Sequence, residues 1–238
     1  MTPALTGAFF VRGRNMDWSF VSAHVPDFLG GAWLTLRFGL YGVACAAVLG
    51  LLCSLARVFR VPVLRAVVRV YVELSRNTPL LVQLFFLYAG LPRIGVKLSA
   101  EACAVVGLTF LGGGYMAEAF RSGLEAVDRT QREAGECVGL TAAQTARYVL
   151  LPQALATAAP ALFANMIFLI KETSMFSVLA MMDLMNVADT LRTGGGETIE
   201  VLCMLIIAYA LILLPVSVLA TVVERRMRFA GFGREHTV

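Results

Sequence analysis

A carboxylate and an amide lie within a mostly apolar stretch in the second half of the chain. Asn165, Phe168 and Glu172 follow one another at helical spacing, so a helix places them on one face, with the amide and the carboxylate two turns apart. Ionisable groups at bilayer depth cost at least ~2.5–3.5 kcal/mol and normally face the protein interior. This face therefore holds a polar ligand, or else Glu172 pairs with Lys171 or with a basic residue on a neighbouring helix.

Sequence signatures of catalysis are missing from the chain. It contains two histidines, His24 and His236, which argues against a histidine-based metal centre. HExxH, GxSxG and paired acidic metal motifs do not occur, and there is no GxxxxGK[ST] phosphate loop. The five cysteines form no CxxC pair. We therefore expect no metal, no cofactor and no catalysis in this chain, including no ATP hydrolysis.

The composition indicates which elements hold the polar residues. The chain has 238 residues, 58% of them apolar and 15% charged, with a mean hydropathy of +0.76. Soluble domains carry about 25% charged residues, so we predict an all-α integral membrane protein with a single domain. A helix needs ~20 mainly apolar residues to cross the hydrocarbon. About five transmembrane helices are expected, at 33–56, 70–91, 100–120, 155–181 and 200–222.

The arginines predict the orientation of these helices. Three regions that fall on one side of the predicted membrane carry 12 of the 20 basic residues, namely Arg57, Arg60, Arg65, Arg69, Arg121, Arg129, Arg132, Arg147, Arg225, Arg226, Arg228 and Arg234. Because positive residues concentrate in cytoplasmic loops, this side is predicted to be cytoplasmic. The N-terminus is then outside and the C-terminus inside. We detect no cleavable signal peptide at the start of the chain.

One of these basic regions contains a polar stretch with clear helix start and stop signals, EAGECVGLTAAQTARYVLLPQAL at 133–155. Thr130 with Glu133 and Thr141 with Gln144 both fit the capping-box spacing, and Gly139 suits the left-handed position that ends a helix. We expect a short helix at about 131–138, a turn at Gly139 and a second helix from 142. Pro152 is expected to interrupt that second helix. The stretch is either a docking element for a partner or a helical hairpin lying on the membrane.

The full spacing of this stretch resembles a known loop. Glu133-Ala134-Gly135, three residues, Gly139, nine residues and then Val149-Leu150-Leu151-Pro152 resemble the EAA loop of bacterial ABC importer permeases, EAA-x3-G-x9-I-x-L-P. In that family the loop fits a groove on the ATPase subunit. The coupling residues that the resemblance implies are Glu133, Ala134, Gly135, Gly139, Leu151 and Pro152.

The resemblance extends over roughly 70–190. ELSRNTPLLVQLFFLYAGLP at 73–92, YMAEAFRSGLEAVDRTQREAGE at 115–136 and IKETS at 170–174 resemble segments of the polar amino acid permeases, the group for His, Glu, Gln, Arg and opine uptake. The departures from that group's pattern are Asn77, Gly114, Ser122, Thr130 and Glu172. The last of these leaves the identity of the amino acid open.

The resemblance implies a half-channel with type I ABC importer permease architecture. Two permease subunits, alike or different, form the pore in the cytoplasmic membrane, and two separate ATPases drive it with ATP and Mg²⁺. A periplasmic or extracellular binding protein delivers a polar amino acid, which crosses by alternating access, and no nucleic acid is involved. Stand-alone secondary transport or channel activity is the alternative function, and a membrane enzyme is a third.

The resemblance also implies a division of the chain and a substrate pathway. Residues 1–32 form a periplasmic N-terminal segment with an interfacial helix, 33–230 form the transmembrane permease domain with coupling helices at 131–151, and 231–238 form a cytoplasmic tail. An amino acid offers an ammonium group to a carboxylate inside the membrane, and amide and hydroxyl groups suit its side chain. The candidate pathway residues are Asn165, Phe168, Glu172, Thr173 and Ser174.

Overall fold

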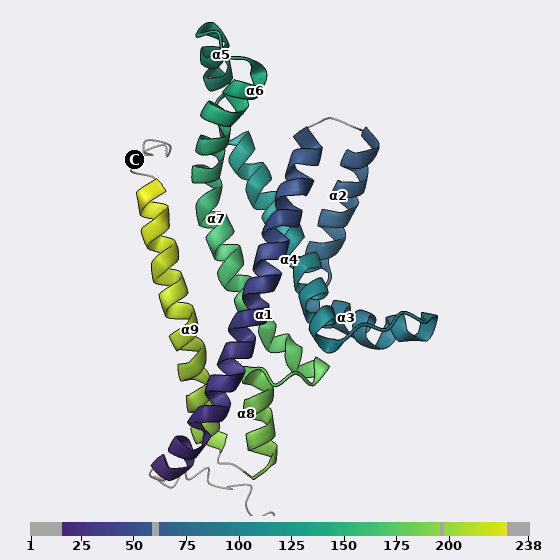
Figure 1. The fold of residues 1–238 in the computed structure, drawn as a ribbon, viewed down its shortest axis with the longest axis vertical. Helices are drawn as coiled ribbons and strands as arrows, with labels where there is room; N and C mark the ends of the chain where they lie inside the picture. Colours follow the sequence, from purple (N-terminus) through teal and green to yellow (C-terminus); the bar gives the residue numbers. More distant parts are fainter. Residues whose placement is uncertain (1–15, 59–61, 196–197, 228–238) are drawn as a thin grey trace, which may run out of the picture.

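The computed structural model describes residues 16–58, 62–195 and 198–227, and this part of the chain is helical with no strand. Its elongated bundle carries a small helical hairpin at one end and helix α8 at the other (Figure 1). The predicted tail at 231–238 lies outside the described residues.

Helix α1 (Trp18–Val58) contains the first expected span and runs past it at its N-terminal end. The structure differs here from the expected separate interfacial helix before residue 33, because 18–32 continue the same helix. The added turns pack against α8 (Leu184–Thr193). Phe28 is buried with Val187 of that helix, and a Cβ on Gly31 would lie 3.1 Å from the Val187 side chain. Tertiary packing therefore extends the helix beyond the membrane length.

The second expected span is not one helix, so the prediction of a continuous helix at 70–91 is wrong. Helix α2 (Pro62–Asn77) ends before Pro79, which has extended backbone, and α3 (Leu80–Phe85) then starts in a different direction. Proline lacks the N–H that a helix needs, and it disfavours helical backbone at the residue before it. The helical turns η1 (Phe86–Gly90) and η2 (Leu91–Ile94) continue α3 as an arm that projects sideways from the bundle (Figure 1).

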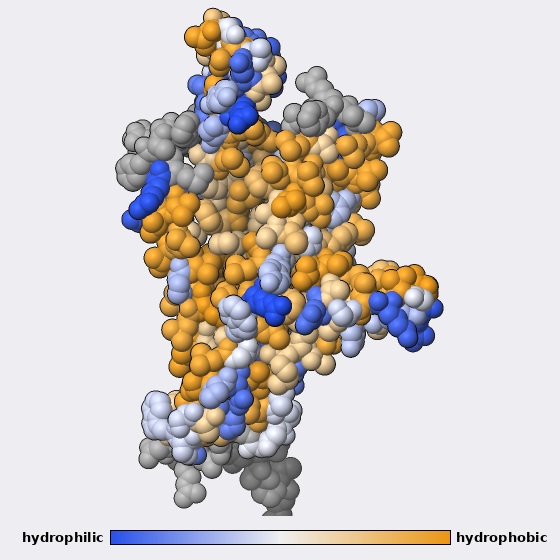
Figure 2. Space-filling model, in the orientation of Figure 1, coloured by the Kyte–Doolittle hydropathy of each residue, from blue (hydrophilic) through white to orange (hydrophobic). Residues whose placement is uncertain are grey.

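The other expected spans are confirmed as helices. They are α4 (Ala100–Glu125), α7 (Leu151–Glu172) with the 3-10 segment η4 (Thr173–Leu179), and α9 (Thr198–Met227). In the described part of the chain, four helical stretches are long and apolar enough to cross a membrane: Trp18–Arg57, Ala100–Glu125, Ala142–Leu179 and Thr198–Arg226. The apolar stretch Leu80–Ile94 is shorter. The space-filling view shows the resulting apolar band between two more polar ends (Figure 2).

Helix α4 is the centre of the bundle and packs against α1, α2 and α7. Gly112 allows this close packing, since a Cβ at this position would lie 2.6 Å from Leu169 and 2.7 Å from Ala46. A Cβ on Gly50 of α1 would likewise lie 2.7 Å from the backbone of α4. Small residues therefore bring these helices into contact at the backbone, as is common between transmembrane helices.

Helix α8 is amphipathic and starts directly after Asp183. Asp183 caps α8 and accepts hydrogen bonds from the backbone N–H groups of Met185 (3.3 Å) and Asn186 (3.2 Å). The side chain of Asp183 is fully buried. Burial raises its pKa from 3.8 to about 6, although the backbone hydrogen bonds act in the opposite direction. The hydroxyl of Thr35 in α1 accepts from the N–H of Leu184 (3.2 Å), which fixes the start of α8.

Candidate functional site

The hairpin at one end of the bundle consists of α5 (Arg129–Cys137), a turn, α6 (Ala142–Thr145) and the wider helical turn η3 (Ala146–Leu150), which leads into α7. The ends of α1 and α9 lie toward the same end of the molecule (Figure 1). The described parts of the three arginine-rich regions therefore lie toward one end of the structure, as their distribution predicted.

One predicted capping box is confirmed and the other is wrong. The Thr141 hydroxyl accepts from the N–H of Gln144 (3.3 Å), and the Gln144 side chain accepts from the N–H of Thr141 (2.9 Å). The first helix instead starts earlier, because Asp128 is its cap and accepts from the N–H of Thr130 (3.0 Å). Glu133 therefore does not take part in a cap, and its carboxylate forms an ion pair with Arg129 (3.1 Å).

Gly139 and Gly135 determine how tightly the hairpin closes. Gly139 has φ +81°, the left-handed value expected at the end of a helix, and the N–H of Leu140 donates to the Gly135 carbonyl (3.0 Å). Gly135 is buried against Thr145, and a Cβ at this position would lie 2.6 Å from its methyl group and 2.8 Å from its hydroxyl. The two short helices therefore touch at a point where no other residue fits unchanged.

Pro152 does not interrupt the second helix as expected. It lies in the first turn of α7, where its missing N–H costs little, and the wide turn η3 absorbs the geometric mismatch before it. The helical path is continuous over 38 residues, Ala142–Leu179. The side chain of Gln153 in α7 also donates to Gln131 in α5 (3.1 Å). The hairpin is therefore joined directly to a helix that crosses the bundle.

The hairpin presents an exposed surface to solvent. Ala134 and Gly139 are exposed, and Leu151 and Pro152 at its base are half-buried. Two apolar side chains that the sequence reasoning missed are also exposed: Val138 by 79% and Tyr148 by 63%. Val138 could have been identified from the sequence, because it is an apolar residue directly before the turn glycine in an otherwise polar segment.

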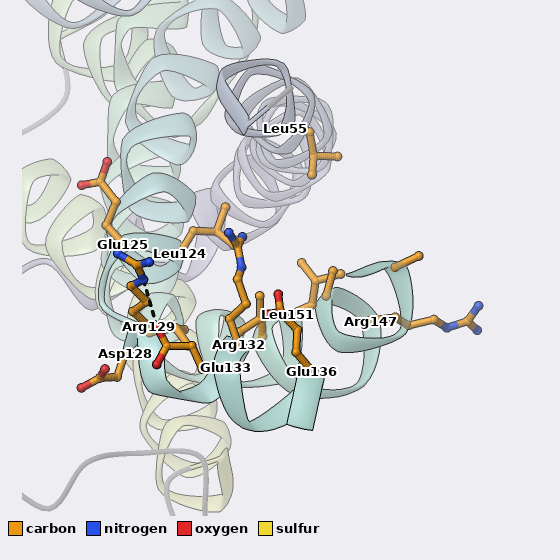
Figure 3. A pocket seen from close by; sticks show the side chains of 14 residues that line it. Leu55, Leu124, Glu125, Asp128, Arg129, Arg132, Glu133, Glu136, Arg147 and Leu151 are labelled. Atoms are coloured by element: carbon orange, nitrogen blue, oxygen red, sulfur yellow. Dashed lines mark ion pairs between the residues drawn. The ribbon is translucent and has the colours of Figure 1, made fainter. Parts of the chain in front are cut away.

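A hollow of about 1170 Å³ separates the hairpin from the ends of α1 and α4. Glu133 and Arg132 line it from α5, and Leu124 lines it from α4 (Figure 3). The side chain of Arg147 points away from the other labelled residues (Figure 3). The hairpin thus stands clear of the bundle along much of its length.

Two of the candidate pathway residues meet α4 of the same chain. The Asn165 amide donates to the Tyr115 carbonyl (3.2 Å), and the Phe168 ring packs on the Tyr115 ring with centroids 5.2 Å apart. The Arg76 guanidinium also lies over the Tyr115 ring, with its central carbon 5.2 Å from the ring centroid. Asn165 and Phe168 therefore lie on the same face of α7, and part of that face is packed against α4 inside the chain.

The other three candidates lie at the end of α7. Thr173 is fully buried and its hydroxyl donates to the Ile170 carbonyl (2.7 Å), whereas Ser174 and Glu172 are half-buried. No lysine or arginine in the described ranges forms an ion pair with Glu172, and Lys171 is exposed. Within the same ranges, no three His, Cys, Asp or Glu side chains come together as a metal site.

Four helical stretches long and apolar enough to cross a membrane, with an exposed hairpin joined to one of them, place the described chain in the class of multi-pass helical membrane proteins. Residues 46–229 match the family described as "Binding-protein-dependent transport system inner membrane component". The "Glutamine transport system permease protein GlnP" of Escherichia coli (strain K12) is 33% identical over 216 residues, covering 90% of this chain and 99% of that protein. The "Probable amino-acid ABC transporter permease protein PatM" of Vibrio harveyi is 36% identical over 213 residues, covering 88% and 94%.

A solved structure shows the same fold. It is described as "Crystal structure of an amino acid ABC transporter with histidines", matches with a TM-score of 0.83 and 32% identity, and covers 90% of this chain and 100% of that one. The chain therefore belongs to the binding-protein-dependent transport system inner membrane component family. It is a multi-pass inner-membrane permease of the ABC transporter type, and this membership speaks against stand-alone secondary transport or channel activity.

Proposed function

We propose that this chain is the transmembrane subunit of an ATP-driven importer that moves a polar amino acid by alternating access. The importer contains two permease subunits, two ATPases and an external binding protein, and ATP with Mg²⁺ binds to the ATPases. The proposal is supported by family membership and by relatives that are described as glutamine and amino-acid permeases.

The single observation that carries the coupling mechanism is the hairpin. Its two helices are locked at Gly135 and Thr145, its apolar tip at Val138 is open to a partner, and its second helix continues without a break into α7. A partner that binds the tip and changes position necessarily moves α7 with it. Closure of the ATPase pair on ATP is the motion that we assign to this element.

The orientation follows from the same element. Because the ATPases act on cytoplasmic ATP, the hairpin end faces the cytoplasm, which puts α8 and the first turns of α1 outside. The clustering of arginines at the hairpin end supports this orientation. Native Cys137 is exposed on the hairpin and provides a test. A membrane-impermeant maleimide should label it in inside-out vesicles only, with Cys137→Ser as the blank, and labelling from the outer face refutes the orientation.

The substrate pathway is assigned to the interface between α7 and the second permease subunit. Glu172 is half-buried and lacks an ion-pair partner in the described part of the chain, which suits it to the ammonium group of an amino acid. Asn165, Phe168 and Ser174 are half-buried on the same helical region, and Thr173 joins them only if α7 moves relative to α1.

Charge reversal at Glu133 in the assembled complex tests the docking role. Glu133→Lys should abolish coupled uptake while the protein still inserts in the membrane. Arg129→Gln removes the same ion pair and should retain uptake, because an exposed pair of this kind contributes about 0.3–0.5 kcal/mol. Glu101→Lys makes the same charge change in the first turn of α4 and should also retain uptake. Unchanged ATP-driven uptake by Glu133→Lys refutes the role of that residue.

A further inference from the structure

A second hollow runs along α2 from Arg65 to Arg76, between this helix and the hairpin-side parts of α1 and α4. We name it the arginine cleft. It has a volume of about 580 Å³ and adjoins the space beneath the hairpin. Its lining residues are mostly charged, and the polar members are Ser54, Arg57, Arg65, Arg69, Glu73, Arg76, Glu118, Arg121 and Glu125.

The charges in the cleft do not cancel. Five arginines face three glutamates, which leaves a surplus of two positive charges (5 − 3 = 2). Glu118 is already paired with Arg121 and with Arg57 (3.6 Å), and Glu125 is paired with Arg121 as well. Arg69 has no ion pair among the residues that the structure describes. The cleft therefore has arginine donors available for an anion that the protein itself does not supply.

A buried hydroxyl in the lining also lacks a partner. Ser54 is 1% exposed, and its oxygen forms no hydrogen bond in the described structure. Leaving a buried polar group unsatisfied destabilises the folded state, so native proteins rarely do so without a reason. An acceptor oxygen that entered the cleft would satisfy this hydroxyl and the neighbouring arginines together.

The level of the cleft in the bundle indicates where such an anion comes from. Arg57 and Glu125 line the cleft and are also the ends of two stretches that are apolar enough to cross a membrane. The end of the cleft at Arg57 and Glu125 therefore lies where hydrocarbon gives way to lipid headgroups. The opposite face of α2 is apolar and strongly exposed, at Val63 (72%), Val70 (65%) and Leu74 (58%). This apolar face of α2 is suited to contact with acyl chains.

We propose that the arginine cleft binds the phosphodiester headgroup of an acidic phospholipid, such as phosphatidylglycerol. Guanidinium groups match phosphate oxygens in a planar, bidentate manner, and basic pockets between membrane helices are suited to such headgroups. Arg65 of α2 already donates to the Arg57 carbonyl of α1 (3.3 Å). A phosphate between Arg65, Arg69 and Arg57 would hold α2 against α1 from the open side of the cleft.

This inference needs only the placement of the chain in a membrane, and it does not depend on the cargo or on ATPase docking. It is tested with the full chain, purified in a neutral detergent. Thermal unfolding is followed with a thiol-reactive dye, because Cys53 and Cys103 are buried until the bundle opens. Phosphatidylglycerol, phosphatidylcholine and inorganic phosphate are titrated separately. We expect a saturable rise in the melting temperature with phosphatidylglycerol alone.

Paired substitutions identify the site. Arg65→Gln and Arg69→Gln should each weaken phosphatidylglycerol binding by about fivefold, the effect expected for one basic residue at an anionic lipid. Arg93→Gln removes an exposed arginine from the arm and should leave the titration unchanged. Equal titrations for wild type and the double variant Arg65→Gln/Arg69→Gln overturn the proposal.

The Ser54→Ala variant tests whether the Ser54 hydroxyl contacts the lipid or has only a structural role. Without lipid, Ser54→Ala should melt at or above the wild-type temperature, because it removes an unpartnered buried hydroxyl. With saturating phosphatidylglycerol, the same variant should melt below wild type. A lower melting temperature in both conditions overturns the assignment of Ser54.

Two other occupants give different results. If inorganic phosphate stabilises the chain as much as the lipid does, the lipid assignment is wrong. If the arginine variants retain the lipid effect but lose association with the ATPase in the assembled complex, the occupant is an acidic surface of that protein, which also overturns the proposal.

Discussion

Adding one methyl group at Gly135 should loosen the hairpin even though it improves the helix that contains it. Alanine is more favourable than glycine in a helix interior by up to about 1 kcal/mol. The new Cβ, however, would lie 2.6 Å and 2.8 Å from the side-chain atoms of Thr145, and overpacking of this kind costs about 1–3 kcal/mol. Thr145 is 1% exposed and has little room to move. We therefore expect the steric cost to exceed the gain in propensity.

Variants at Thr145 measure how much of the loss in stability comes from the clash with the new methyl group. Thr145→Ala removes both atoms that clash and leaves its Cβ 3.3 Å from the new methyl group, so Gly135→Ala/Thr145→Ala should recover the stability of the Thr145→Ala parent and gain helix propensity. Thr145→Ser keeps the hydroxyl at 2.8 Å and should rescue only in part. The coupling free energy in this double-mutant cycle should be at least about 1 kcal/mol.

Hydrogen exchange at the Leu140 amide is the assay, because this N–H donates to the Gly135 carbonyl and reports hairpin opening. A net loss of about 1–2 kcal/mol lowers its protection about 5- to 30-fold in Gly135→Ala. Amides in the middle of α4 serve as the internal reference and should not change. Unchanged or increased protection in Gly135→Ala, with no coupling to Thr145, would show that the contact does not determine how the hairpin closes.

Further predictions concern the bundle and are checked by thermal unfolding in detergent. Gly50→Ala should destabilise the chain by about 1–3 kcal/mol because its Cβ would meet the backbone of α4, whereas Gly30→Ala, with no atom within 4 Å, should not destabilise it and should gain up to about 1 kcal/mol of helix propensity. Thr35→Val keeps the shape of the side chain but leaves the Leu184 N–H without its acceptor, at a cost of about 1–3 kcal/mol, while Thr35→Ser should remain close to wild type. The pKa of Asp183 is raised to about 6 by burial, so its contribution to stability is fully present below pH 3.8 and is lost as the pH rises through 6. The free energy of unfolding should fall by about 1.4 kcal/mol between pH 5 and pH 8, and Asp183→Asn should remove that dependence.

The hairpin could be predicted from the sequence because its determinants are local. Thr141 with Gln144 and the glycine at 139 specify a helix start and a helix end from a few adjacent residues, and the structure agrees with both. The start of the first helix was misplaced because Asp128 and Thr130 both qualify as caps, and spacing alone does not decide between them. The contact between Gly135 and Thr145 depends on the closed hairpin and leaves no local signal.

Hydropathy alone does not predict the break in the second expected span. The apolar run through 70–91 satisfies the length criterion, but the dipeptide Thr78-Pro79 ends the helix within it. The proline was visible in the sequence, whereas the direction of the arm after it depends on packing against α4. Similarly, the period of Asn165 and Phe168 predicted one face of α7 but not its contact with Tyr115, because that contact joins residues 50 positions apart.

The unbroken path from Ala142 to Leu179 has a geometric consequence. At about 1.5 Å per residue, its 38 residues extend over at most about 57 Å, so a rigid tilt of about 10° at the hairpin end would displace the far end by up to about 10 Å. A displacement of that size is comparable to the width of a helix. In the transport cycle that we propose, a small movement of a partner at the hairpin would therefore produce a larger movement at the far end of α7, and no bond in the hairpin would have to break.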